Sequence, residues 1–310
     1  MNPAFSVVFL TTFIGAAQGL LFALYGAEWA GRYGEIAMPD GRQFFALGVA
    51  IVFVLASLGL VASFFHLGRP ERAWRAASQW RTSWLSREVI VLPAFIAAAL
   101  LYGTAHALGW RGTAAYGAVA AVLAIALFVC TGMIYACIRF LQEWATPLTV
   151  VNFFLLGTAS GLTLAAAFSA LVAPAFASGF ALIAALITLV GLATRSTSLF
   201  RNARIRPKST LQTAIGVRHP RIVQKAQGFM GGSFNTREFF HGRSRDFLRN
   251  VKWAFLLLAF VVPIALLVLG RGAPAYIAAF VVQFVGLIAE RWFFLAQANH
   301  PQNLYYQSIS

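Results

Sequence analysis

Two long apolar stretches of this chain are joined by the run His66-Leu-Gly-Arg-Pro-Glu-Arg-Ala-Trp-Arg-Ala-Ala-Ser-Gln-Trp-Arg-Thr-Ser-Trp-Leu-Ser-Arg-Glu88. A histidine closes the first stretch (44–66), and a glutamate stands at the start of the second (87–108). Each stretch is near the ~20 residues that a helix needs to cross ~30 Å of hydrocarbon. If both cross a membrane, His66 and Glu88 lie at the same membrane face and at a similar depth.

The composition of the whole chain is that of a membrane protein. Of its 310 residues, 60% are hydrophobic and only 11% are charged, and its mean hydropathy is +0.74. A soluble domain carries about a quarter charged residues. The chain has 24 Lys and Arg against 9 Asp and Glu. These cations gather in a few connections, so they predict membrane orientation and not a nucleic-acid partner.

The hydropathy pattern predicts an all-α membrane protein, an eight-helix bundle that forms one integral membrane domain over residues 1–310. A polar, basic segment, 196–251, interrupts it. Gly157 and Gly161 form a small-xxx-small pattern, which predicts a close helix contact in the fifth span. The span 178–195 is the shortest. The predicted spans are 5–29, 44–66, 87–108, 114–138, 150–173, 178–195, 252–270 and 274–296.

The cations also predict which way the bundle faces. With an even number of spans both termini lie on one side, and the connections on that side hold nineteen Lys and Arg against four on the other. Basic connections stay in the cytoplasm, so both termini are expected to be cytoplasmic. Arg291 is expected to snorkel to the interface, Glu28 is expected to be interfacial, and Glu290 either lines a cytoplasmic pocket or snorkels as well.

His66 and Glu88 have two readings. An imidazole titrates near neutrality, and ionisable groups at membrane depth are expensive to keep, so the pair suits proton exchange with a lipid-soluble carrier such as a quinone. Arg69 or Arg72 would hold the Glu88 charge or polarise a carbonyl. Alternatively, Glu88 only complements a helix N-terminus and His66 only caps a helix end. The two readings are evenly balanced.

The sequence predicts no haem, iron–sulfur cluster or other metal in this chain. A b-type haem needs two histidines that face one another at similar depth, and no pair has that placement among His66, His106, His219, His241 and His300. The two cysteines, Cys130 and Cys137, cannot hold a cluster.

The segment 196–251 also has two readings. Its cations would be attracted to anionic lipid, but lipid attraction does not need the aromatic and turn residues interspersed among them. We therefore favour a docking surface for a soluble partner. These residues are Phe229, Met230, Gly231, Gly232, Phe234, Phe239 and Phe240.

Several motifs resemble a known family. His66-Leu-Gly-Arg-Pro-Glu-Arg72, Trp84-Leu-Ser-Arg-Glu88 and the eight-span plan resemble the membrane-anchor subunit of dimethyl sulfoxide reductase, over the whole chain. Phe234-Asn-Thr-Arg-Glu-Phe-Phe-His241 and Asn299-His-Pro-Gln-Asn-Leu-Tyr-Tyr306 are similar to the membrane subunit of the cytoplasmic, quinone-dependent sulfite dehydrogenases.

This resemblance implies a complex in the bacterial inner membrane. A molybdopterin subunit would do the substrate chemistry, and an iron–sulfur subunit docked on the cytoplasmic face would carry the electrons. The anchor, without haem, would exchange them with ubiquinone or menaquinone and have no catalytic residue for the substrate itself. By motif match the quinone-site residues fall on His66, Arg72 and Glu88.

Three other functions stay open at this point. The same pocket suits a sulfoxide reductase that oxidises quinol, because the direction of electron flow is not written in the anchor. A secondary transporter is a different class, but transporters carry internal repeats and midplane charges, and neither is evident. A passive tether would tolerate changes at both His66 and Glu88.

Overall fold

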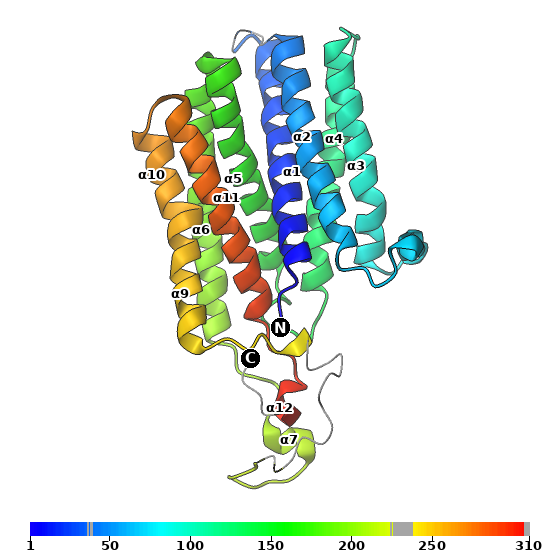
Figure 1. Cartoon of the computed structure of the whole chain (residues 1–310), viewed down its shortest axis with the longest axis vertical. Helices are drawn as coiled ribbons and strands as arrows, with labels where there is room; N and C mark the ends of the chain where they lie inside the picture. The colour runs from blue at the N-terminus through cyan, green and yellow to red at the C-terminus, as the bar shows by residue number, and fades with distance from the viewer. Residues whose placement is uncertain (36, 38–39, 224, 226–237, 307–310) are drawn as a thin grey trace.

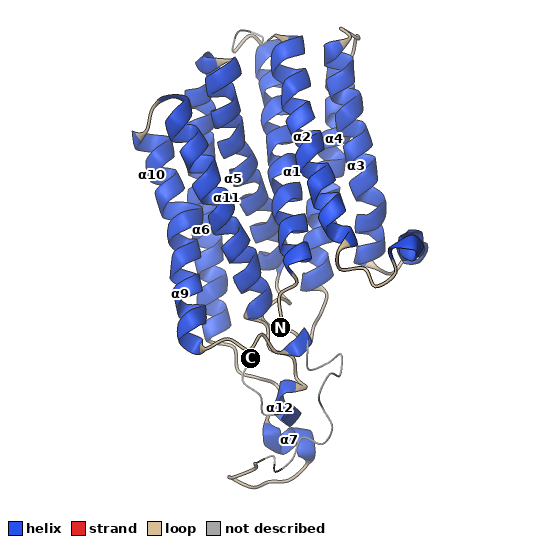
Figure 2. Cartoon of the chain, in the orientation of Figure 1, coloured by secondary structure: helices blue, strands red, loops and turns tan. Residues whose placement is uncertain are grey.

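The computed structural model describes residues 1–35, 37, 40–223, 225 and 238–306, and every regular element in these ranges is helical (Figure 2). Eight of the helices are long and apolar enough to cross a membrane, as predicted. In hydrocarbon only a helix or a closed barrel satisfies every backbone hydrogen bond. The bundle is thus the form that this hydropathy pattern dictates.

Six spans are regular α-helices and two contain a π-helical turn. The regular ones are α1 (Phe5–Arg32), α3 (Trp84–Ala107), α4 (Thr113–Ala136), α5 (Pro147–Val172), α6 (Pro174–Ala203) and α11 (Gly272–Ala296). The others are η1–α2 (Gly41–Ala46, Leu47–Phe64) and α9–η3–α10 (Arg245–Leu256, Leu257–Val261, Val262–Leu269). Short helices are η2 (Pro70–Gln79), α7 (Leu211–Ile215) and α12 (Asn303–Tyr306).

Helices α1 and α5 form the centre of the bundle (Figure 1). Helices α2 and α4 pack on α1, and α3 lies against α2 and α4. Helices α6 and α11 pack on α5, and α9 and α10 lie against α11. The backbones of α1 and α5 approach each other through glycines, as the small-xxx-small pattern predicted. A Cβ on Gly161 would overlap the backbone of Gly19, and one on Gly19 would stand 2.5 Å from the carbonyl oxygen of Gly157. Small residues let helix backbones approach closely where lipid supplies no hydrophobic drive.

The N-terminus, α7 and α12 lie at one end of the bundle (Figure 1). We call this the basic end, because the basic connection 65–83 and the described residues of the connection after α6 (204–223, 225 and 238–244) are there too. The connection 108–112 and residues 33–35, which follow α1, lie at the opposite end. The 3₁₀-helix η2, between α2 and α3, projects sideways from the bundle at the basic end.

The sixth span differs most from its predicted limits. Instead of the shortest span, 178–195, α6 is the longest, with 30 residues from Pro174 to Ala203. The hydropathy pattern ended this span at Arg195, but that side chain is 1% exposed and points into the bundle. The helix therefore continues, and the basic connection starts at Arg204 and not at 196.

Candidate functional site

Three of the four predicted site residues lie on the exposed connection at the basic end. Helix α2 ends at Phe64, so His66 lies just beyond it, and its side chain is exposed. Partial desolvation by the surrounding protein lowers the pKa of His66 below its usual value, which favours the neutral ring. Arg69 and Arg72 are exposed too, and Arg72 has a long contact with Glu71, at 3.9 Å.

Glu88 is buried, unlike the other three. Ser83 caps α3 by accepting a hydrogen bond from the Ser86 amide, so Glu88 stands in the second turn, beyond the reach of a simple helix-end effect. Its side chain is 8% exposed and accepts a hydrogen bond from the Thr131 hydroxyl of α4. The carboxylate faces the interior of the bundle.

A small cavity lies beside the Glu88 carboxylate. Its volume, about 10 Å³, is close to the space that one water molecule needs. Besides Glu88, the residues Thr11, Gln18 and Thr131 supply polar atoms to its wall, and the other four lining residues are apolar. The full lining consists of Leu10, Thr11, Ile14, Gln18, Glu88, Phe128, Thr131 and Phe153.

The structure does not bring the side chains of the four predicted residues into direct contact. Within the described ranges, no side-chain hydrogen bond or ion pair joins any two of His66, Arg69, Arg72 and Glu88, although the Arg72 amide donates to the Arg69 carbonyl at 3.0 Å. They share one end of the bundle, where Glu88 is inside it and the other three are on its surface. A ligand that bridged them would have to reach from the surface into the helix interface.

An open apolar groove of about 370 Å³ runs along α1 and α2 and ends at Phe65, the residue before His66. Phe65 is 83% exposed. The groove is lined by Ser6, Phe9, Phe13, Leu58, Val61, Ala62 and Phe65. Its position on the outer surface of a membrane-spanning bundle suits a hydrocarbon chain.

A buried charge cluster near the basic end was not predicted. Arg195 Nε of α6 lies 2.7 Å from Glu290 Oε1 of α11, and Arg291 Nη1 lies 3.3 Å from Glu290 Oε2. All three residues are at most 5% exposed. The expectation that Arg291 snorkels was therefore wrong, because an ion pair inside the bundle replaces water. The sequence signal for this ion pair was the presence of an ionisable residue, Arg195 or Glu290, within each of two apolar spans.

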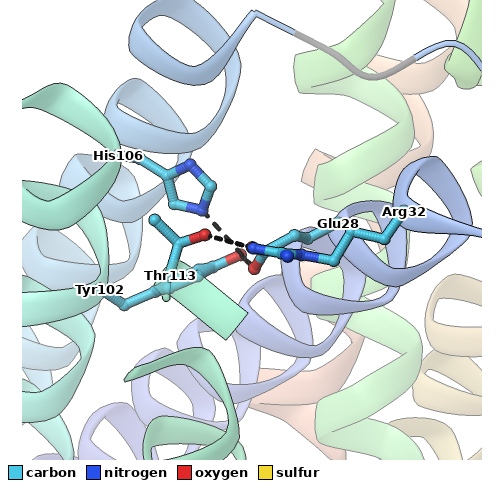
Figure 3. Close-up of polar contacts among 5 residues, drawn as sticks. All are labelled: Glu28, Arg32, Tyr102, His106 and Thr113. Atoms are coloured by element: carbon cyan, nitrogen blue, oxygen red, sulfur yellow. Dashed lines mark hydrogen bonds and ion pairs between the residues drawn. The ribbon is translucent and has the colours of Figure 1, made fainter. Parts of the chain in front are cut away.

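A second polar cluster lies at the opposite end, around Glu28 of α1 (Figure 3). The expectation of an interfacial side chain was wrong, because Glu28 is fully buried. Arg32 and Thr113 donate to Oε1 at 2.8 and 2.5 Å, and Tyr102 donates to Oε2 at 3.0 Å. His106 Nε2 lies 3.6 Å from Oε2. The cluster links α1 to α3 and α4, so we interpret it as a structural clamp that holds these three helices together.

Replacing Glu28 by Ala is expected to destabilise the protein by about 3 kcal/mol, because removing one partner leaves buried polar groups unpaired. A lower melting temperature in detergent would show it. Asp246→Ala, which breaks the exposed pair with Arg249, is the control and should change nothing measurable. Equal melting of the two variants would contradict the clamp.

The basic connection is described only in part. Phe229, Met230, Gly231, Gly232 and Phe234, on which the docking prediction depends, lie outside the described residues. The segments 234–241 and 299–306, which resemble the sulfite dehydrogenase subunits, contact each other through their described residues. The rings of Phe239 and His300 stack with centroids 3.7 Å apart.

A cleft of about 510 Å³ opens at the basic end, beside this contact. Its walls come from the connection after α4, the last turn of α6 with the residues that follow it, and the C-terminal segment. They include Glu143, Asn202, Lys208 and His300.

The comparisons with known proteins agree with the resemblance seen in the sequence. The family model described as DMSO reductase anchor subunit (DmsC) matches residues 1–294. The chain is also 53% identical, over 326 aligned positions that cover both chains fully, to a sulfite dehydrogenase subunit of Allochromatium vinosum. With eight apolar helices, the chain is thus a multi-pass membrane protein that belongs to the DMSO reductase anchor subunit family.

Proposed function

We propose that this protein is the quinone-reactive anchor of a molybdopterin and iron–sulfur oxidoreductase complex. It would exchange electrons between an iron–sulfur partner and membrane quinone, in the course of sulfite oxidation. The observation that carries the proposal is the buried carboxylate of Glu88, beside a cavity near the basic end. Family membership removes the transporter alternative.

The groove along α1 and α2 supports a quinone site at this end. Its apolar walls suit an isoprenoid tail, and at Phe65 it reaches the connection that carries His66. A neutral imidazole donates one hydrogen bond to a quinone carbonyl, and Arg72, with Arg69 as an alternative, supplies a positive charge. Glu88 would then exchange the protons. Quinone is an exchangeable substrate here, and this chain needs no haem or iron–sulfur cluster for the role.

The basic end also supports partner docking. Helix η2 exposes Trp74, and Trp80 follows it, each with an arginine over its ring. Large exposed aromatics with arginines are typical of protein interfaces, although indoles also suit the lipid interface. By the positive-inside rule this end is cytoplasmic, in the bacterial inner membrane, so the iron–sulfur subunit would bind here.

The substrate of the complex is inferred from the relative. That protein is named as part of a sulfite dehydrogenase, which favours sulfite oxidation with reduction of quinone. The family takes its name from DMSO reductase, and an anchor of that kind would oxidise quinol instead. The same pocket serves both directions, since only the sign of electron flow differs.

The test is to purify the protein with a C-terminal tag in mild detergent and identify its companions by mass spectrometry. We expect a molybdopterin subunit and an iron–sulfur subunit, with sulfite-dependent reduction of a short-chain ubiquinone or menaquinone. Quinol-dependent sulfoxide reduction without sulfite activity would replace the proposed substrate. A protein that purifies without metal-bearing companions would overturn the proposal.

A further inference from the structure

Three cavities form a series that leads from the basic end to Glu88. The cleft at the surface shares Glu143 and Asn202 with a buried polar cavity around Arg195 and Glu290. That polar cavity in turn shares Phe153 with the cavity beside Glu88. Each space therefore borders the next through a common wall.

The middle cavity is built almost entirely from polar side chains. Arg195, Glu290 and Arg291 form its charged wall, opposite Asn152 and Ser198. Its volume is about 10 Å³, the space of about one water molecule. Asn152 donates to the Ser198 hydroxyl at 2.8 Å, which leaves its own carbonyl oxygen without a partner.

Arg195 offers a second unpaired group in this cavity. Its Nη2 is buried and has no hydrogen-bond partner among the described residues. Buried polar atoms are normally paired, and where the protein gives them no partner an ordered water does so. A donor on Arg195 and an acceptor on Asn152 together suit a water molecule.

The Phe153 ring lines both this cavity and the one beside Glu88. The Arg291 guanidinium carbon lies 3.8 Å from the centroid of Phe153, and Phe153 also lines the Glu88 cavity. A rotation of one side chain is a much smaller barrier than a packed helix interface.

The ionisable groups that line the two buried cavities balance in favour of one additional proton, and the surface cleft adds Lys208 and His300 outside them. Glu143, Glu290 and Glu88 contribute three negative charges, and Arg195 and Arg291 contribute two positive ones. With all five groups ionised the net charge is −1, so a single proton neutralises the set. A route with a net positive charge would repel protons instead.

We propose that these cavities are the proton route between the cytoplasmic solution and Glu88. The inference rests on the proposed function, because Glu88 needs a route only if it exchanges protons with quinone. Reduction of one quinone to quinol takes two electrons from the partner and two protons. The protons would pass from the cleft, by ordered water at Asn152 and Arg195, past Phe153 to Glu88, and quinol oxidation would reverse the path.

The test is Asn152→Leu in the intact complex, a change that keeps the number and branching of side-chain heavy atoms and removes the water acceptor without touching a charge. Ser198 still donates to the Thr194 carbonyl. Quinone turnover should fall about tenfold, as expected when a proton-transfer step is impaired, and its solvent deuterium isotope effect should increase. Electron transfer from the substrate to a water-soluble acceptor should be unchanged.

Gln283→Leu is the matched control, since Gln283 is a buried amide of α11 that bonds to Thr188 and lines none of the three cavities. It should leave turnover per complex unchanged. Glu290→Gln is the second route variant, and it should raise the isotope effect as Asn152→Leu does.

Normal turnover and isotope effect in both route variants, with Glu88→Gln impaired, would overturn the route and leave the proposed function standing. A slow Asn152→Leu complex with an unchanged isotope effect would mean a structural role and would also overturn it. Normal turnover in Glu88→Gln would instead count against the proposed role of Glu88 itself.

Discussion

Replacing Glu88 by Gln is expected to lower quinone turnover by about 100-fold or more while the complex stays assembled. General acid–base groups contribute ~10²–10⁴-fold to rate, and an amide cannot take up or release the proton. The fold should tolerate the change, because Gln has nearly the same volume and its amide oxygen can accept the hydrogen bond from Thr131. The measurement is steady-state quinone reduction by the purified complex.

Glu28→Gln is the matched control for this prediction. Glu28 is also a buried carboxylate that accepts a hydrogen bond from a threonine, but it lies at the opposite end of the bundle. Turnover per assembled complex should be unchanged in this variant. If Glu88→Gln showed the quinone kinetics of the wild type, Glu88 would have no part in proton exchange. The protein would then serve as a tether.

Replacing Gly161 by Ala is expected to destabilise the bundle by more than about 3 kcal/mol. Overpacking a well-packed site costs ~1–3 kcal/mol, and the new Cβ would overlap backbone atoms of Gly19 and Leu20, which cannot rotate away. The two central helices would have to separate. Monodisperse yield and melting temperature in detergent are the measurements.

Gly179→Ala is the control for that prediction. Gly179 also lies in a membrane-spanning helix, but a Cβ there meets nothing within 4 Å. Since Ala is the better helix former, this variant should be as stable as the wild type or slightly more stable. Similar melting temperatures for the two variants would show that α1 and α5 can separate enough to fit the extra methyl group at little cost.

The sequence predicted the parts of the fold that depend on local composition. Apolar runs of about twenty residues identified all eight helices, because length and hydropathy alone decide whether a helix can cross hydrocarbon. The contact at Gly157 and Gly161 was predictable for the same reason. A small-residue repeat on one helix face is a local signal.

The misplaced residues are those whose environment depends on a partner far along the chain. Arg195 seemed to end a span because its ion pair with Glu290 joins positions nearly a hundred residues apart. Glu28 looked interfacial because its partners Tyr102, His106 and Thr113 come from two other helices. The signal that could have predicted these contacts is the presence of ionisable or polar residues at matching depths in different predicted spans.

The candidate site was predictable in type but not in arrangement. The sequence placed His66 and Glu88 at one membrane face, and both lie at the basic end. It did not indicate that Glu88 turns inward to Thr131 while His66 stays on the surface. That difference follows from helix rotation, which packing sets and a hydropathy pattern does not record.

The glycine contact between α1 and α5 has a consequence for how the protein is made. Helix α1 leaves the ribosome long before α5, and at ~5–20 residues per second the delay is on the order of ten seconds. During that time the most buried helix of the bundle stands in lipid without its main neighbour. The insertion machinery therefore has to hold or shelter α1 until the second half of the chain arrives.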